Sequence, residues 1–285
     1  MAIVAAGSMW GASANPDVAA IIARSVEAND RDWKTAPEYT YFERDRGPGG
    51  STTWQVSMIL GSPYRKLVAW NGHALPPEEQ ANEQHKLEET IAERREETLS
   101  ERSNRVAEYE RDRRRDHLLL NQLTVAFNFR LLGQQRLGPH TVFVLQATPR
   151  PGYTPPNREA KVLTGMEGKL WMDTRTFQWV KVEAQVIHPV WIEGFLARVD
   201  PGTRFELEYA PVTNDIWLPT HFEMRSRARI LFVFPRRDRV DESYFGYERA
   251  AASETVAAAL SRRLLHNRIE LLCTQTTEKH IYLIE

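Results

Sequence analysis

The chain has little of what usually reveals a protein's chemistry. It contains one cysteine, Cys273, among 285 residues, which excludes an internal disulfide framework and a multi-cysteine metal site. Its 37 basic and 38 acidic residues give a net charge of −1, so composition does not favour nucleic acid or an anionic membrane as a general partner. No apolar run approaches the roughly 18 residues that a membrane-spanning helix needs. The composition therefore indicates a globular protein of one large or two small domains.

The motifs of common enzymes and metal sites are also missing. The sequence has no HExxH or cysteine–histidine zinc spacing, no GxSxG elbow and no phosphate-binding or dinucleotide-binding loop. We therefore expect no enzyme, no cofactor and no bound metal. One alternative stays open, a hydrolase whose site is assembled from distant residues, with these candidates: His140, His188 and His221 together with Asp173 or Asp215.

The N-terminus carries an apolar run of small residues. Residues 2–14, AIVAAGSMWGASA, end in Ala12-Ser13-Ala14, which fits the A-x-A pattern of a signal-peptidase site. The positively charged segment that normally opens a signal peptide is absent, and the alternative is an apolar N-terminus without a targeting role. We expect residues 1–14 to be a truncated signal-peptide remnant and the protein to be exported to the periplasm.

The next segments predict a helix followed by a strand meander. Residues 15–33 carry an amphipathic stripe formed by Val18, Ile21, Ile22 and Val26. Residues 38–46, 51–60 and 64–72 read as strands, and the turns between them are rich in Gly and Pro. An antiparallel meander follows from this spacing.

Residues 78–132 contain neither Gly nor Pro and are rich in Glu, Arg and Gln, so we expect a helical insertion over 77–124. Thr98-Leu99-Ser100-Glu101 fits a capping box, which predicts two helical arms with a break near 98–104. The charges indicate a solvated surface. The alternative is an arm over 77–117 that docks a partner.

The stretch GKLWMDTRTFQWVKVEA, residues 168–184, reads as a β-hairpin that is apolar on both faces. Simple alternation about the turn at 173–176 places Leu170, Met172, Val180 and Val182 on one face and Trp171, Phe177 and Trp179 on the other. A curved sheet that encloses an apolar cavity would explain two apolar faces. The alternative is a sheet filled by its own helices.

The same reasoning predicts a cavity lining and a basic strip. Large apolar residues at inward positions are the predicted lining: Trp54, Met58, Trp70, Leu170, Met172, Val180, Val182, Phe205, Leu207, Tyr209, Phe222 and Met224. On the opposite face of the last of these strands lie Arg225, Arg227 and Arg229. These arginines are either solvated or form a strip for an acidic partner or lipid headgroups. Residues 251–285 are a C-terminal extension to which the sequence assigns no role.

Four stretches together resemble a known superfamily over residues 15–250: RKLVAWNGHALPPEE, the hairpin above, PGTRFELEYAPVTNDIWLP and YFGYER. The chain resembles the LolA/LolB superfamily of periplasmic lipoprotein carriers, from which the charged insertion and the tail depart. The resemblance implies an α+β fold, mainly antiparallel, in which an open, incomplete β-barrel with lid helices encloses a cavity for acyl chains. It implies a non-enzymatic carrier or chaperone, a monomer with no nucleic-acid partner, that binds acyl chains of lipoproteins or lipids. The alternative from another class is a structural or protein-interaction module of the cell envelope that uses the charged arm.

Overall fold

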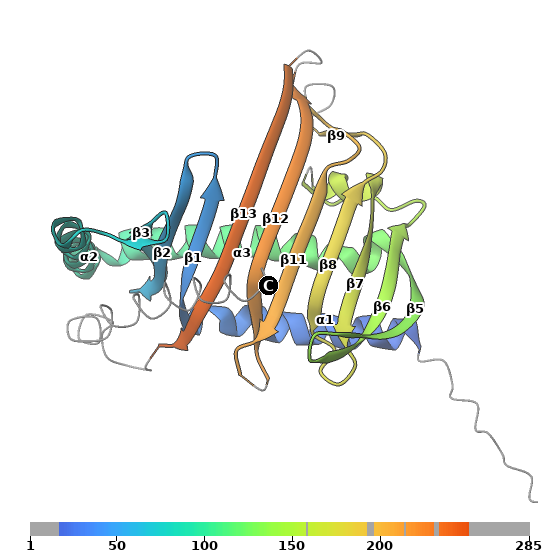
Figure 1. The fold of residues 1–285 in the computed structure, drawn as a ribbon, viewed down its shortest axis with the longest axis horizontal. Coiled ribbons are helices and arrows are strands. Elements are labelled where there is room, and N and C mark those ends of the chain that lie inside the picture. The colour runs from blue at the N-terminus through green and yellow to red at the C-terminus, as the bar shows by residue number, and fades with distance from the viewer. Residues whose placement is uncertain (1–16, 158, 193–196, 214, 231–233, 251–285) are drawn as a thin grey trace, which may run out of the picture.

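The computed structural model describes residues 17–157, 159–192, 197–213, 215–230 and 234–250. The predicted signal remnant, 1–14, and the extension, 251–285, lie outside the described residues. The described chain forms one 13-stranded sheet in the order β4-β3-β2-β1-β13-β12-β11-β8-β7-β6-β5, with β9 and β10 added beside β12 (Figure 1). The strands are β1 Tyr39–Gly47, β2 Gly50–Ile59, β3 Ser62–Trp70, β4 His73–Ala74, β5 Phe127–Leu137, β6 His140–Pro149, β7 Met166–Asp173, β8 Trp179–Val186, β9 Val190–Ile192, β10 Ala197–Val199, β11 Arg204–Pro211, β12 Trp217–Ile230 and β13 Phe234–Arg249.

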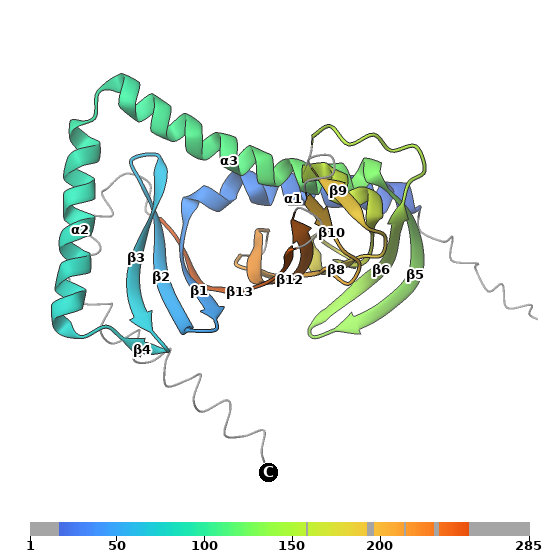
Figure 2. The same cartoon turned by 90° about the horizontal axis from the view of Figure 1, so that it is seen from above.

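Within the described ranges, three α-helices accompany the sheet: α1 Val18–Thr35, α2 Pro77–Glu96 and α3 Leu99–Ala126. Two short 3-10 helices span Ala36–Glu38 and Glu159–Gly165. Figure 2 shows that α1 and α3 lie on one side of the curved sheet, whereas α2 stands beyond β3 at its end. We call the side covered by α1 and α3 the helical face and the other the open face. The sheet does not close into a barrel, because β4 and β5 stand at opposite ends of the strand order, and the predicted α+β open half-barrel with helices is confirmed.

Local chemistry fixes where the helices begin. Asp17 caps α1 by accepting a hydrogen bond of 2.9 Å from the backbone N–H of Ala19. Thr98 caps α3 with the predicted capping box, in which the Thr98 hydroxyl accepts from the Glu101 N–H and the Glu101 carboxylate accepts from the Thr98 N–H. The predicted break between two helical arms therefore lies at Glu97 and Thr98, directly between α2 and α3.

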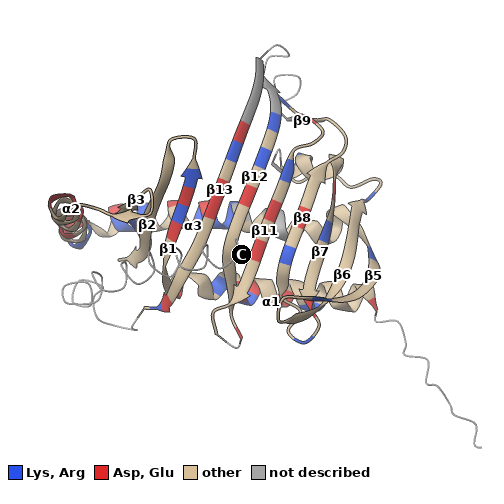
Figure 3. Cartoon of the chain, viewed as in Figure 1, with Lys and Arg blue, Asp and Glu red and all other residues tan. Residues whose placement is uncertain are grey.

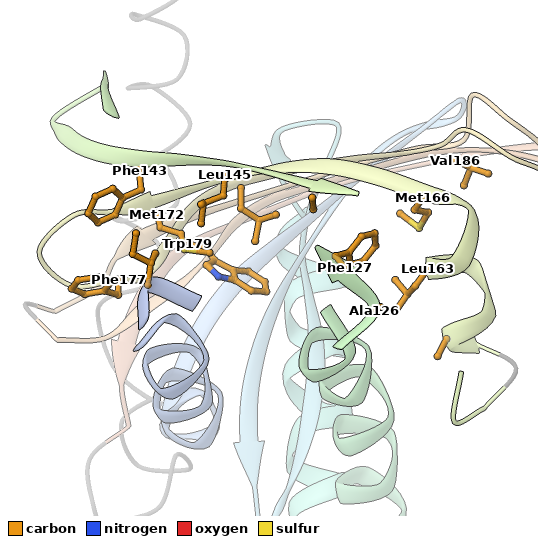
Figure 4. Packing of buried hydrophobic residues seen from close by; sticks show 14 of the residues in the cluster. Ala126, Phe127, Phe143, Leu145, Leu163, Met166, Met172, Phe177, Trp179 and Val186 are labelled. Carbon is orange, nitrogen blue, oxygen red and sulfur yellow. The ribbon is translucent and has the colours of Figure 1, made fainter. Parts of the chain in front are cut away.

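The main hydrophobic core occupies only one half of the helical face. It lies between strands β5–β8, helix α1, the end of α3 and the second 3-10 helix. Figure 4 shows Phe143, Leu145, Met172 and Trp179 pointing from the sheet towards the helices. Leu145 is 0% exposed and Met172 is 1% exposed, so this half is sealed.

A β-bulge changes which side chains of the β7–β8 hairpin share a face. Leu170 pairs with Val182 and Trp171 with Lys181, but Met172 pairs with Trp179, so Val180 is the extra residue. Trp179 therefore joins Leu170, Met172 and Val182 on the helical face, as does Phe177 at the turn.

The predicted split of the hairpin was wrong for three residues, because simple alternation does not allow for a bulge. Val180 lies on the open face, where it packs with Val142, Val144 and Trp217 beside Trp171. Phe177 and Trp179 lie on the helical face, not opposite Leu170. The second apolar face of the hairpin thus contacts a small satellite core built around Trp217.

Within the described residues, none of the helices combines the length and the apolar character needed to cross a membrane.

Candidate functional site

One cross-strand row on the helical face runs from acidic to apolar. Each residue pairs in register with its neighbour on the next strand, so all side chains of the row point to the same side. In order from β1 to β7 the row is Asp45, Glu242, Phe222, Leu207, Val182 and Leu170. The Leu170 end is sealed at 4% exposure, while the residues between the two ends are half-buried.

The middle of this row belongs to a half-buried apolar surface that we call the apolar floor. It consists of Val182, Phe205, Leu207, Phe222 and Met224, with Phe205 paired to Met224 and Leu207 paired to Phe222. Val182 and Phe205 pack against the edge of the main core. Leu207, Phe222 and Met224 join none of the buried clusters found among the described residues. The floor is therefore apolar surface that the described part of the chain neither seals nor fully exposes.

The other predicted lining residues are distributed elsewhere. Leu170 and Met172 are sealed in the core, and Val180 lies on the open face. Tyr209 packs edge-on against Trp179 with ring centroids 6.2 Å apart. The remaining three come from the meander: Trp54 and Met58 are half-buried, and Trp70 is 51% exposed beside β4. The structure thus brings five of the predicted residues together as the floor.

Polar side chains border the floor on the β1–β13 side. We call Tyr41, Glu43, Asp45, Glu242 and Tyr244 the acidic–tyrosine cluster. Carboxylate oxygens of Glu43, Asp45 and Glu242 lie within 4.8 Å of one another. The Tyr244 hydroxyl donates a hydrogen bond to Glu242, and the rings of Tyr41 and Tyr244 meet at 6.1 Å.

One cation neutralises part of this cluster. The Arg65 guanidinium lies 2.6 Å from Glu43 Oε1 and 3.1 Å from Asp45 Oδ2. Burial nevertheless raises the pKa of Glu43 to about 7, against the opposing effect of Arg65 and with the help of the negative charge on Asp45. Burial also raises the pKa of Tyr41 to about 12. Because Arg65 and Tyr244 already bind these carboxylates, their chemistry does not call for a metal, and we assign none.

Helix α1 is fastened to the sheet by a buried polar network. The Gln178 amide nitrogen donates to both oxygens of Asp32, at 3.2 and 2.9 Å, and to the backbone carbonyl of Asp215 at 2.8 Å. The Trp179 indole N–H donates to the Ser25 hydroxyl at 2.7 Å. Asp32 is 4% exposed, and burial raises its pKa to about 6. The network sets how α1 lies across the core, next to the floor.

A second contact joins α1 to α3 and should make stability depend on pH. His117 stacks on Trp33 at 4.2 Å, is 7% exposed, and its Nε2 lies 3.3 Å from Asp30 Oδ1. Burial lowers the pKa of His117, against the effect of Asp30 and helped by the charge on Arg113. The folded state therefore holds the proton less firmly than the unfolded state, whose histidine pKa is about 6.5.

We expect the His117 contribution to the free energy of unfolding to be complete above pH 6.5 and to be lost as the pH falls below it. Chemical denaturation of the wild type and of His117→Gln between pH 5 and 7.5 checks this. The difference between the two free energies should shrink as the solution becomes more acidic. A difference that is constant with pH would contradict a histidine held neutral by burial.

Of the histidines considered for a hydrolase, one contacts an acidic candidate. His140 Nδ1 lies 3.3 Å from Asp173 Oδ2, and the His140 ring packs on Trp217 at 4.7 Å. The other Asp173 oxygen accepts from the backbone N–H groups of Arg175 and Thr176 and closes the turn. No contact joins His188 or His221 to this pair within the described residues. The Thr176 hydroxyl also donates to this second oxygen at 3.2 Å, so Asp173 stabilises the turn between β7 and β8.

The predicted basic strip lies on the face opposite the floor. Arg225 and Arg227 are exposed on the open face, whereas Phe222 and Met224 of the same strand point to the helical face. The side chain of Arg229 lies outside the described residues. Because the sheet separates the strip from the floor, the two surfaces would contact different ligands or partners.

Sequence reasoning missed the acidic–tyrosine cluster and Asp32. A signal was present for the cluster, because Tyr41, Glu43 and Asp45 alternate along one strand, as do Glu242 and Tyr244 along another. The pairing of β1 with β13, about 200 positions apart, is what joins the two patterns.

Fold and site together define an open half-barrel with a half-buried apolar floor beside a polar cluster. No family model matches the chain, and no curated protein matches it in sequence. Among solved structures it is similar to a domain described as an outer membrane lipoprotein-sorting protein from Vibrio parahaemolyticus, with 9% identity and a TM-score of 0.29 over 84% of this chain and 99% of that one.

Two further solved structures contain MucB. MucB in complex with MucA(peri) has 12% identity and a TM-score of 0.23 over 83% of this chain and 100% of that one. The Pseudomonas aeruginosa MucA/MucB complex has 11% identity and a TM-score of 0.21 over 80% and 99%.

Proposed function

We propose that the protein is a non-enzymatic carrier or chaperone that binds an acyl chain of a lipoprotein or lipid on the apolar floor. One observation carries the proposal: Leu207, Phe222 and Met224 form a contiguous apolar surface that is only half-buried and belongs to none of the buried clusters of the described chain. The floor ends on one side at a sealed core and on the other at polar side chains. An acyl chain with a polar end fits that order.

The energetics favour a surface of this kind. Each methylene that leaves water is worth about 0.8 kcal/mol, so ten methylenes on the floor amount to about 8 kcal/mol before the cost of ordering the chain. A sealed core could not release such a ligand, whereas a half-buried floor can. Met224 and the flexible leucine side chain can repack around chains of different length. The Ala12-Ser13-Ala14 pattern supports placing this carrier in the cell envelope, where acylated cargo must cross an aqueous space.

Native mass spectrometry of the protein, purified from a lysate that contains membranes, tests the proposal. We expect co-purifying acyl species, and we expect the protein to displace or bind a fluorescent fatty-acid probe. A clean unliganded mass together with no probe binding would contradict a carrier.

A second candidate function is an interaction module that docks a protein partner of the envelope through the helical arm. The observation that favours this function is the exposure of Leu99. Its side chain is 86% exposed at the corner between α2 and α3, and an exposed large apolar side chain can mark a contact site for another protein. Replacing Leu99 by Ser should leave the melting temperature within about 1–2 °C, since surface substitutions change stability by about 0.5 kcal/mol or less. If acyl binding is the function, the variant should still bind the probe at wild-type affinity. Unchanged probe binding combined with loss of a purified envelope partner would favour the interaction module.

A further inference from the structure

A pocket of about 470 Å³ lies on the open face of the sheet, opposite the apolar floor. Charged and amide side chains from β6, β7, β8, β11 and β12 line it. Figure 3 shows acidic and basic bands along β11 and β12, two of the strands that line the pocket. The pocket is therefore polar, unlike the floor, and has no part in the acyl site.

The pocket charges are sorted into two cross-strand rows of opposite sign. Glu183, Glu206 and Glu223 stand in register on β8, β11 and β12. Two residues further along these strands, Arg204 and Arg225 stand in register on β11 and β12. At about 3.3 Å per residue, the two rows are about 7 Å apart.

The rows are neutralised unequally. Lys181 binds Glu206 at 2.8 Å and Glu183 at 3.0 Å. Arg225 binds Glu223 at 2.7 Å. Arg204 is exposed and has no acidic partner within 4 Å in the described part of the chain.

Like charges that face each other across strands destabilise a sheet, and here both rows contain such pairs. Arg204 faces Arg225, and Glu206 faces Glu183. Lys181 gives Glu183 and Glu206 a single positive charge, which it also shares with Glu208 at 3.5 Å. An anion held between the two arginines and a second cation held by the two glutamates would therefore relieve the charge that remains in both rows. Lys169, a second cation without an acidic partner among the described residues, lines the far wall next to Glu183.

We propose that this pocket binds a zwitterionic phosphate ester, with its phosphate on Arg204 and Arg225 and its ammonium group on Glu183 and Glu206. Guanidinium groups bind phosphate oxygens with paired, charge-assisted hydrogen bonds. The free oxygens of the two glutamates accept from the ammonium group. The source is either a soluble ester of the phosphoethanolamine type or the headgroup of a lipid that carries it. A lipid bound here is not the one on the apolar floor, because the sheet lies between them.

Calorimetric or ligand-observed NMR titration of the full chain with glycerophosphoethanolamine and with glycerophosphate tests the proposal. We expect the zwitterion to bind more tightly than glycerophosphate. Arg204→Gln should weaken both ligands by about 10- to 100-fold, the effect of losing one hydrogen bond to a charged group. Glu206→Gln should weaken only the zwitterion.

Arg227→Gln is the matched control, because Arg227 is exposed on the same face and lies outside the pocket. It should leave both affinities unchanged, and the three variants should melt within a few degrees of the wild type. Equal affinity for the two ligands, or an Arg204→Gln variant that binds like the wild type, would overturn the proposal. Flotation with phosphatidylethanolamine and phosphatidylcholine vesicles identifies the source of the ligand. If the wild type floats with the phosphatidylethanolamine vesicles and Arg204→Gln does not, the ligand is a lipid headgroup. If the protein binds the soluble ester but does not float, the ligand is a free ester.

Discussion

Replacing Asp32 by asparagine should stabilise the protein at neutral pH. The carboxyl is 4% exposed, and burial raises its pKa from an ordinary value of 3.8 to about 6. A group whose pKa is raised on folding favours the folded state when protonated, so its contribution is lost as the pH rises from about 4 to 6. At pH 8 the loss is about 3 kcal/mol, since each pKa unit is worth 1.36 kcal/mol. Asparagine keeps the shape without the charge and should raise the melting temperature by roughly 6–12 °C.

The oxygen of the Gln178 amide is buried and has no hydrogen-bond partner among the described residues. If the Gln178 amide flips, this oxygen can accept a hydrogen bond from the amide nitrogen of the new asparagine. Asp30→Asn is the matched control on the same helix. Hydrogen bonding to Lys34 lowers the pKa of Asp30, so removing its charge should not stabilise the protein. Thermal melting at pH 4, 6 and 8 decides the matter. A variant of Asp32 that is destabilised at pH 8, or whose stability changes with pH like the wild type, would contradict a destabilising buried carboxylate.

Replacing Leu207 by glutamate should abolish acyl binding and leave the protein folded. Leu207 lies at the centre of the apolar floor, paired with Phe222 on one side and Val182 on the other. A carboxylate there would have to lose its hydration against a bound chain, which is costly without a partner. In the unliganded protein water can reach a half-buried side chain. We therefore expect a loss of at least ~10-fold in probe affinity and only a small change in melting temperature.

Leu132→Glu makes the same chemical change at a position on β5 that is 43% exposed, away from the floor, and should change neither quantity. If the Leu207 variant unfolds, with a loss of several kcal/mol typical of a charge in a packed core, the floor is part of a filled barrel. If it stays folded and binds fully, the acyl chain does not lie on this face.

Most of the fold could be predicted from the sequence because its local signals agree with one another. The Gly- and Pro-punctuated strands, the capping box at Thr98 and the uninterrupted charged segment each reappear as an element with nearly the expected ends. Local patterns did not predict the bulge that places Val180 on the open face. A bulge depends on how two paired strands fit together, and alternation along a single strand does not register it.

The candidate site was predictable in its parts and not in its assembly. Phe205, Leu207, Phe222 and Met224 could be placed on one face because polar residues alternate with them. Leu170 and Met172 are sealed and Leu207 is half-buried because of where α1 crosses the sheet. The hydrogen bonds between Asp32 and Gln178, which are 146 positions apart in the sequence, hold α1 in that place. The acidic–tyrosine cluster likewise needs β13 to return beside β1. Such long-range pairings are set by the fold as a whole, so one strand's sequence does not contain them.

The central claim, that an acyl chain lies on the apolar floor, is tested most directly by the methionine methyl groups. Met224 belongs to the floor, whereas Met166 and Met172 are buried in the sealed core at 5% and 1% exposure. Methyl NMR spectra of methionine-labelled protein should be recorded with increasing amounts of a fatty acid that carries a nitroxide near its chain end. We predict strong broadening of the Met224 signal at ligand ratios that leave Met166 and Met172 sharp. A Met224 signal that stays sharp while the ligand is bound would contradict the account.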